Sequence, residues 1–193
     1  QVVFHSAQEH LQDQGIDGWL IYDYRGMNPI FRELVGDIPN VTRPCWIWIP
    51  AIGQSVLLIS YVDQGRFAHL DISTIRFVSR QDMTVALERM LGTAKTIAME
   101  YSPTGELPRV SKVDAGTLEL VRDLGVRVVS SADTLQYATQ RWSEPQHRSH
   151  MEAASKLSSI VHHAFDYIGE NLSKLVTEYD VAEFIRRRFV SEG

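Results

Sequence analysis

Residues 16–29 read IDGWLIYDYRGMNP, and the fold class of the chain follows from this segment. Its first part, residues 16–22, ends in the apolar run WLIY, which predicts a buried strand over this segment. A helical pattern over residues 4–14 precedes the strand and stops at Gly15, a residue type that commonly ends helices. A helix that leads into a fully buried strand is typical of layered α/β proteins, so we predict an α/β fold.

Further predicted strands follow along the chain. Two apolar runs, residues 45–49 and 55–59, are joined by a short link that contains Gly and Pro, which predicts an antiparallel hairpin. Later strands at residues 75–78, 96–99 and 126–129 alternate with helices, and this order favours parallel neighbours. The sheet is therefore predicted to be mixed and flanked by helices.

After residue 141 the pattern becomes purely helical. Ser143 can cap the first free amides of a helix, and Gln146 stands where the reciprocal capping contact belongs. Apolar residues then recur at three- and four-residue spacing, which predicts one amphipathic helix of about 28 residues. Thr177 is predicted to cap a second helix. We therefore divide the chain into residues 1–141 and residues 142–193, and the apolar stripes of the two late helices require a partner.

Composition excludes several classes of protein. The net charge of -5 provides no basic field for a phosphate backbone, so we expect no nucleic-acid partner. No segment approaches the roughly 20 apolar residues of a membrane-spanning helix, so we expect no membrane partner either. The single cysteine, Cys45, cannot form an intramolecular disulfide, and the expected location is cytoplasmic. Glycine-rich nucleotide motifs and the Gly-x-Ser-x-Gly nucleophile motif do not occur in the sequence.

The turn after the first strand, residues 23–29, is the first candidate site. Ligands of α/β proteins gather beyond the carboxyl ends of the strands, and turn residues here could present Arg25 outward to a carboxylate. The alternative is that Arg25 and Asp23 simply pair with each other and order the turn.

Histidine and cysteine side chains offer weaker candidates. His147 and His150 have a spacing that could offer two imidazoles to one metal ion, but no carboxylate or thiol stands at a matching position. An exposed first helical turn is the alternative reading of this pair. Cys45 is predicted to be a buried, inert thiol, and strand alternation places Trp46 and Trp48 together on the opposite face.

Several of these segments together resemble one protein family, the creatinase/prolidase-type metallopeptidases, and they match its N-terminal domain. The order of motifs carries the resemblance, which covers essentially the whole chain. Leu175 departs from it, because the family has Gly before the Thr-Glu that opens its second catalytic helix. The matching segments are residues 17–29, 42–46, 100–103, 107–111 and 114–117, the junction at 142–146 with 152–154, and residues 177–182.

The resemblance implies the architecture and the cofactors. Residues 1–141 would form a creatinase/prolidase-type N-terminal domain with a mixed sheet of about six strands, and residues 142–193 the first two helices of a truncated pita-bread catalytic domain. Such proteins activate water with two divalent metal ions, such as manganese, cobalt or zinc. Two Asp, one His and two Glu hold these ions, all later in the family order than this chain reaches. No catalytic residue and no metal ligand is therefore expected within these residues.

The resemblance also implies the partners and the function. Members are typically homodimers whose N-terminal domain helps to close the neighbouring active site, and Arg25, Asn28 and Arg43 are the candidate substrate-facing residues. The partners would be the chain's own catalytic domain, a second subunit and a peptide substrate. The implied function is that of a non-catalytic domain of an Xaa-Pro peptidase, either aminopeptidase P or a dipeptidase. The alternatives are a creatinase-like hydrolase of a small guanidino or amide compound, and a catalytically dead binding or assembly module.

Overall fold

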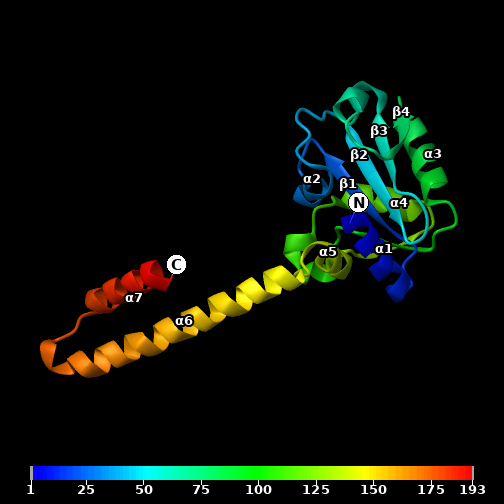
Figure 1. The fold of residues 1–193 in the computed structure, drawn as a ribbon. Helices are drawn as coiled ribbons and strands as arrows, with labels where there is room; N and C mark the ends of the chain where they lie inside the picture. The colour runs from blue at the N-terminus through cyan, green and yellow to red at the C-terminus, as the bar shows by residue number, and fades with distance from the viewer. Residues whose placement is uncertain (1, 193) are drawn as a thin grey trace. The chain divides into compact units, whose positions relative to one another are not determined.

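The structure is a computed structural model that describes residues 2–192, drawn in Figure 1. The chain forms two compact units that divide after Arg141. The first unit contains the sheet and its flanking helices, and the second consists of helices alone.

The first unit is built on one mixed sheet of six strands, as predicted. The strand order is β4-β3-β2-β1-β5-β6. Strand β2 is antiparallel to both of its neighbours, while all other pairings are parallel. The strands other than β2 therefore end at the same edge of the sheet, which we call the carboxyl edge. The strands are β1 (Gly18–Tyr24), β2 (Pro44–Pro50), β3 (Val56–Ser60), β4 (Ser73–Phe77), β5 (Thr96–Met99) and β6 (Arg127–Ser130).

The predicted pairings are correct except for one. The hairpin of β2 and β3 is antiparallel, and β5 and β6 are parallel neighbours. Strand β4, however, lies at one end of the sheet beside β3, and β1 and β2 separate it from β5. The strand-helix-strand order correctly predicted that β4, β5 and β6 run in the same direction, but it did not predict which strands are neighbours in the sheet.

Helices cover both faces of the sheet and form two hydrophobic cores. Residues of α1 and α2 pack on one face with Cys45 and Ile47, and residues of α3 and α4 pack on the other face with Trp46 and Trp48. The predicted alternation along β2 is thus confirmed. The helices of this unit are α1 (Val2–Gln14), α2 (Pro29–Val35), α3 (Arg80–Leu91), α4 (Ala115–Asp123) and α5 (Ala132–Thr139), with short 3-10 turns at η1 (Tyr61–Arg66), η2 (Pro103–Gly105) and η3 (Pro108–Val110).

The second unit contains α6 (Glu144–Asn171), η4 (Leu172–Lys174) and α7 (Glu178–Glu192). The capping box of Ser143 and Gln146 opens α6, and the helix has the predicted length of 28 residues. The rings of Tyr167 and Phe184 stack with centroids 4.6 Å apart and join α6 to α7. Few side chains of the pair are buried, because α7 has none and α6 has only Ile160 and Ala164. None of the helices in residues 2–192 is long and apolar enough to cross a membrane.

Candidate functional site

The candidate site lies at the carboxyl edge, where β1 ends in a tight turn. Arg25 and Gly26 both have positive φ angles, 59° and 73°, and the amide of Met27 donates to the carbonyl of Tyr24 over 3.2 Å. Two successive left-handed residues define the type I′ turn. The left-handed conformation costs a residue with a side chain about 1–2 kcal/mol, so Arg25 stands in a position that would suit Gly better.

A buried carboxylate holds this turn in place. Asp23 is 2% exposed, and its two oxygens accept the backbone amides of Gly26 over 2.8 Å and of Asn28 over 2.7 Å. Hydrogen bonds from amides to a charged carboxylate contribute about 1.5–3 kcal/mol each, enough to offset the strain at Arg25. No ion pair between Asp23 and Arg25 forms among the residues that the structure describes. The alternative that these two side chains pair was therefore wrong. The Asp23 carboxylate orders the turn by accepting hydrogen bonds from the backbone amides of the turn.

Asn28 has a positioning role inside the domain. Its side chain is 2% exposed. The amide nitrogen donates to the Tyr22 carbonyl over 2.7 Å and to Glu100 Oε2 over 3.1 Å, and its oxygen caps α2 at the amide of Ile30. Asn28 thus has little surface to present outward, contrary to the expectation that it faces a substrate. The physical reason is that it serves as the N-cap of a helix that packs into the core.

Glu100, directly after β5, is the centre of this buried network. Its Oε1 accepts from Trp19 Nε1 over 2.6 Å and from the Ser131 hydroxyl over 3.3 Å, and its Oε2 accepts from Asn28. Complete burial raises the pKa of Glu100 to about 7, although hydrogen bonds from Trp19, Asn28 and Ser131 act in the opposite direction. We call Glu100, Trp19, Asn28 and Ser131 the Glu100 network. It ties β1, the turn before α2 and the start of α5 to one carboxyl group that titrates near neutral pH.

A second buried carboxylate fixes the segment before β2. Asp63 is 1% exposed, and one of its oxygens accepts the amides of Thr42 and Arg43, each over 3.0 Å. Its other oxygen pairs with Arg66 Nε over 3.2 Å. Asp63 therefore fixes the backbone at Arg43 through the Arg43 amide, while the Arg43 side chain stays exposed.

The register of β1 and β2 brings the two arginines to the same place. Tyr24 pairs with Pro44 at the end of the ladder, so the next residues, Arg25 and Arg43, lie at the same end of the two strands. Both side chains are exposed, and each stands on backbone that a buried carboxylate holds. Exposed apolar side chains accompany them at this edge, namely Tyr24, Met27, Tyr61, Val62 and Val78. This arrangement can bind an anion, in particular a carboxylate, next to apolar groups.

The fold has known counterparts among solved structures. The chain superposes on an X-Pro dipeptidase domain from Streptococcus pyogenes, the creatinase/prolidase N-terminal domain, with a TM-score of 0.55 and 12% identity, over 69% of this chain and 95% of that one. The first unit has the fold of the creatinase/prolidase N-terminal domain. A scan of family models and a search of curated proteins find no match.

Two longer chains are also similar. Prolidase from Pyrococcus horikoshii has a TM-score of 0.55 at 16% identity, with 100% of this chain and 49% of that chain covered. Dipeptidase PepE from Mycobacterium ulcerans has a TM-score of 0.56 at 20% identity, with 99% and 49% covered. The chain thus spans about half the length of these two proteins.

The side chains of residues 2–192 do not form a dinuclear metal centre. Within residues 2–192 no three His, Cys, Asp or Glu side chains come together in a way that could hold a metal ion. His147 and His150 lie beside the ring of Trp142, with centroid distances of 6.4 and 4.2 Å.

Burial raises the pKa of the Cys45 thiol well above its usual value, and the Asp23 and Asp63 carboxylates add to this effect. A neutral, buried thiol is a poor nucleophile and a poor metal ligand.

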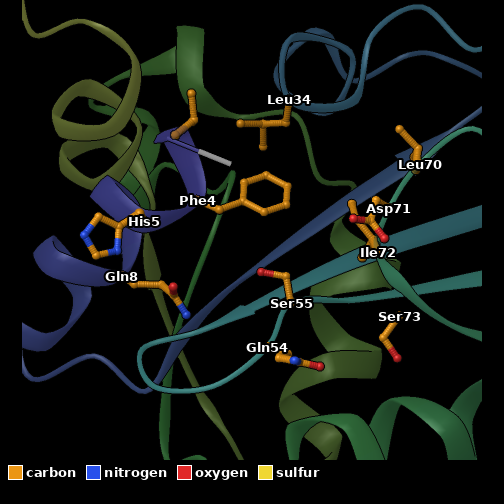
Figure 2. A pocket seen from close by; sticks show the side chains of 11 residues that line it. Phe4, His5, Gln8, Leu34, Gln54, Ser55, Leu70, Asp71, Ile72 and Ser73 are labelled. Atoms are coloured by element: carbon orange, nitrogen blue, oxygen red, sulfur yellow. The ribbon is translucent and has the colours of Figure 1, made fainter.

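A hollow of the first unit lies away from this site. It has a volume of about 580 Å³ and is lined by α1 and by the segments that precede β3 and β4, at the opposite edge of the sheet (Figure 2). The amide of Gln8 is already bound to the carbonyls of Pro50 and Gly53 over 2.8 and 2.9 Å. His5 and Asp71 also line it, but both are exposed and come from different elements. The hollow lacks the buried, prearranged polar groups that mark the carboxyl edge.

Proposed function

We propose that this chain is the non-catalytic N-terminal part of a dinuclear-metal Xaa-Pro peptidase, either aminopeptidase P or a dipeptidase. Its role is to shape the active site and to mediate dimerisation. One observation carries the proposal: Arg25 and Arg43 stand exposed at one end of β1 and β2, each on backbone that a buried carboxylate holds rigid. The similarity of the fold to prolidases and dipeptidases supports the same assignment.

The chemistry of the two arginines suits the end of a short peptide. A guanidinium group binds a carboxylate through two parallel hydrogen bonds, and a short peptide carries such a carboxylate at its C-terminus. Because the backbone at Arg25 and Arg43 is already ordered, binding loses less conformational entropy than it would on a flexible loop. The exposed rings and methyl groups beside them, such as Tyr24 and Met27, can contact the apolar part of a substrate or of a neighbouring subunit.

The catalytic step itself belongs to other segments in this proposal. Two divalent metal ions would supply an activated water molecule, and their ligands would come from parts of the protein outside residues 2–192. The second unit supports the presence of a larger catalytic domain, because α6, α7 and the segment between them leave many large apolar side chains exposed. These are Met151, Leu157, Val161, Phe165, Leu172, Leu175, Tyr179, Phe189 and Val190. Apolar surface of this extent normally lies against other protein.

The test is hydrolysis by the protein expressed from its native gene, with added manganese. The proposal predicts cleavage of Xaa-Pro dipeptides or tripeptides and no cleavage by the chain of residues 1–193 alone. Cleavage of creatine in place of Xaa-Pro peptides would favour a creatinase-like hydrolase. Failure to cleave either substrate, with stable dimers still formed, would favour an assembly module of the same fold. Either of these results would overturn the proposal.

A further inference from the structure

Polar side chains join the two late helices, in addition to the aromatic stack described above. Arg188 of α7 donates from Nη2 to Nδ1 of His163 on α6 over 3.0 Å. Further along the pair, Lys156 Nζ donates to the backbone carbonyl of Glu192 over 2.8 Å. Residue numbers rise along α6 as they fall along α7, so the two helices are antiparallel (Figure 1). Because few side chains of the pair are buried, we expect these polar contacts to contribute a large share of its stability.

The chemistry of Arg188 determines the protonation state of His163. A guanidinium group has only N–H donors and no acceptor, and it stays charged in proteins. His163 Nδ1 must therefore accept this hydrogen bond, which requires a neutral imidazole with its proton on Nε2. The same nitrogen of Arg188 also pairs with Glu192 Oε1 over 2.9 Å, which holds the guanidinium group in place beside the ring.

His163 Nδ1 has a second neighbour, which lies on its own helix. The hydroxyl of Ser159 is 3.3 Å from this nitrogen. Unlike a guanidinium group, a hydroxyl can accept a hydrogen bond as well as donate one. A protonated His163 carries a hydrogen on Nδ1, so it cannot bond to Arg188 but can donate to Ser159. Repulsion between the two cations acts in the same direction.

The other charged groups near His163 do not oppose this change of partner. The carboxylate of Glu192 is already paired with Arg188. Asp166 lies three positions after His163, where it would stabilise a protonated imidazole. The titratable or charged side chains near the ring are Lys156, His162, Asp166 and Tyr167 of α6 and Arg188 and Glu192 of α7.

We propose that the α6–α7 pair is a pH-sensitive switch, in which His163 bonds to Arg188 of α7 when neutral and to Ser159 of α6 when protonated. Histidine is the side chain that ordinarily changes its charge between about pH 5 and 8. The contact between the helices is therefore present at neutral pH and is lost on acidification. The switch lies within the second unit and does not depend on the peptidase assignment.

The experiment is amide hydrogen exchange of α7 in the chain of residues 1–193, at about pH 7.5 and about pH 5.5, on either side of the ordinary titration of histidine. Protection factors, which divide out the intrinsic exchange rate at each pH, report how often α7 opens. We expect protection to fall about two- to fivefold at the lower pH, the range for one exposed pair of polar side chains.

Three substitutions outside the buried core separate the switch from a general effect of acid. His163→Gln removes the titrating group, and Arg188→Gln removes the group that can only donate. Each should make the protection of α7 independent of pH. His162→Gln is the matched control, because it changes the neighbouring histidine, which points about 100° away around the helix. This variant should keep the pH dependence of the wild type.

The proposal fails if α7 of the wild type has the same protection at both pH values, or if His163→Gln keeps the pH dependence. A lack of any protection in α7 at the higher pH would also overturn it, because the two helices would then not be docked.

Discussion

Replacing Glu100 by glutamine should remove a pH dependence from the stability of the first unit. In the folded domain the pKa of Glu100 is about 7, against an ordinary value of 4.5 for a glutamate. The folded state therefore holds this proton more tightly than the unfolded state does. Its stabilising contribution is complete below pH 4.5 and is lost as the pH rises through 7.

The size of the effect follows from the shift. Each pKa unit corresponds to about 1.36 kcal/mol, so the free energy of unfolding should fall by about 3 kcal/mol across this titration because of Glu100. Like the protonated carboxyl group, the side-chain amide introduced by Glu100→Gln has an acceptor oxygen and a donor, but it does not titrate. The difference in unfolding free energy between the two proteins therefore changes by about 3 kcal/mol as the pH rises, in the direction that favours the variant.

The assay is urea unfolding at a series of pH values from about 4.5 to 8, followed by tryptophan fluorescence. The relevant quantity is the difference in unfolding free energy between wild type and Glu100→Gln, because other titrating groups cancel in it. Glu106→Gln, which changes an exposed glutamate in the next loop, is the matched control and should give a flat difference. A flat difference for Glu100→Gln as well would show that folding does not raise the pKa of this carboxyl group.

Three further substitutions test the turn at Arg25, the hydrogen bonds of Asp63 and the packing between β1 and β2. Arg25→Gly should raise the free energy of unfolding by about 1 kcal/mol, since Gly adopts the left-handed turn without strain; lower stability in a thermal melt would contradict this. Asp63→Asn should cost about 1–3 kcal/mol in chemical unfolding, because one carboxylate oxygen that serves amides or Arg66 becomes a donor; no loss would show that these bonds add nothing. Gly18→Ala should cost about 1–3 kcal/mol or more, because the added methyl group would overlap the ring of Trp48, and a variant with wild-type stability would disprove that contact.

Much of the fold could be predicted because local patterns dictate it. The capping box at Ser143 and the helix length after it depend only on neighbouring residues, and both are confirmed. The first strand was predicted to begin at Ile16, but β1 begins at Gly18. The reason is that the amide of Ile16 donates to the carbonyl of Leu11, so residues 15 and 16 cap the C-terminal end of α1 and are not part of the strand. The short helices α2 and α5 were missed, because helices of 7 and 8 residues are too short for a clear periodic pattern.

The site could be predicted only in part. The turn at Arg25 was identified from its Gly, Asn and Pro residues, and Asn28 followed by Pro29 was also the available signal for the start of α2. The roles of Asp23, Asp63 and Glu100 were not predicted. Trp19 and Glu100 are 81 positions apart in the sequence, so no local pattern shows that their side chains meet. An acidic residue directly after a buried strand was the signal for Glu100, but burial itself depends on the tertiary fold.

The role proposed for the two arginines is tested most sharply by the KM for an Xaa-Pro dipeptide, measured with the protein expressed from its native gene in the presence of manganese. Arg25→Gln and Arg43→Gln should each raise KM about tenfold or more with little change in kcat, because each removes a charged partner of the substrate carboxylate. Arg127→Gln, which changes an exposed arginine at the start of β6, should leave KM unchanged. If the Arg25 and Arg43 variants behave like the Arg127 variant, the carboxyl edge does not contact the substrate and the proposed role is wrong.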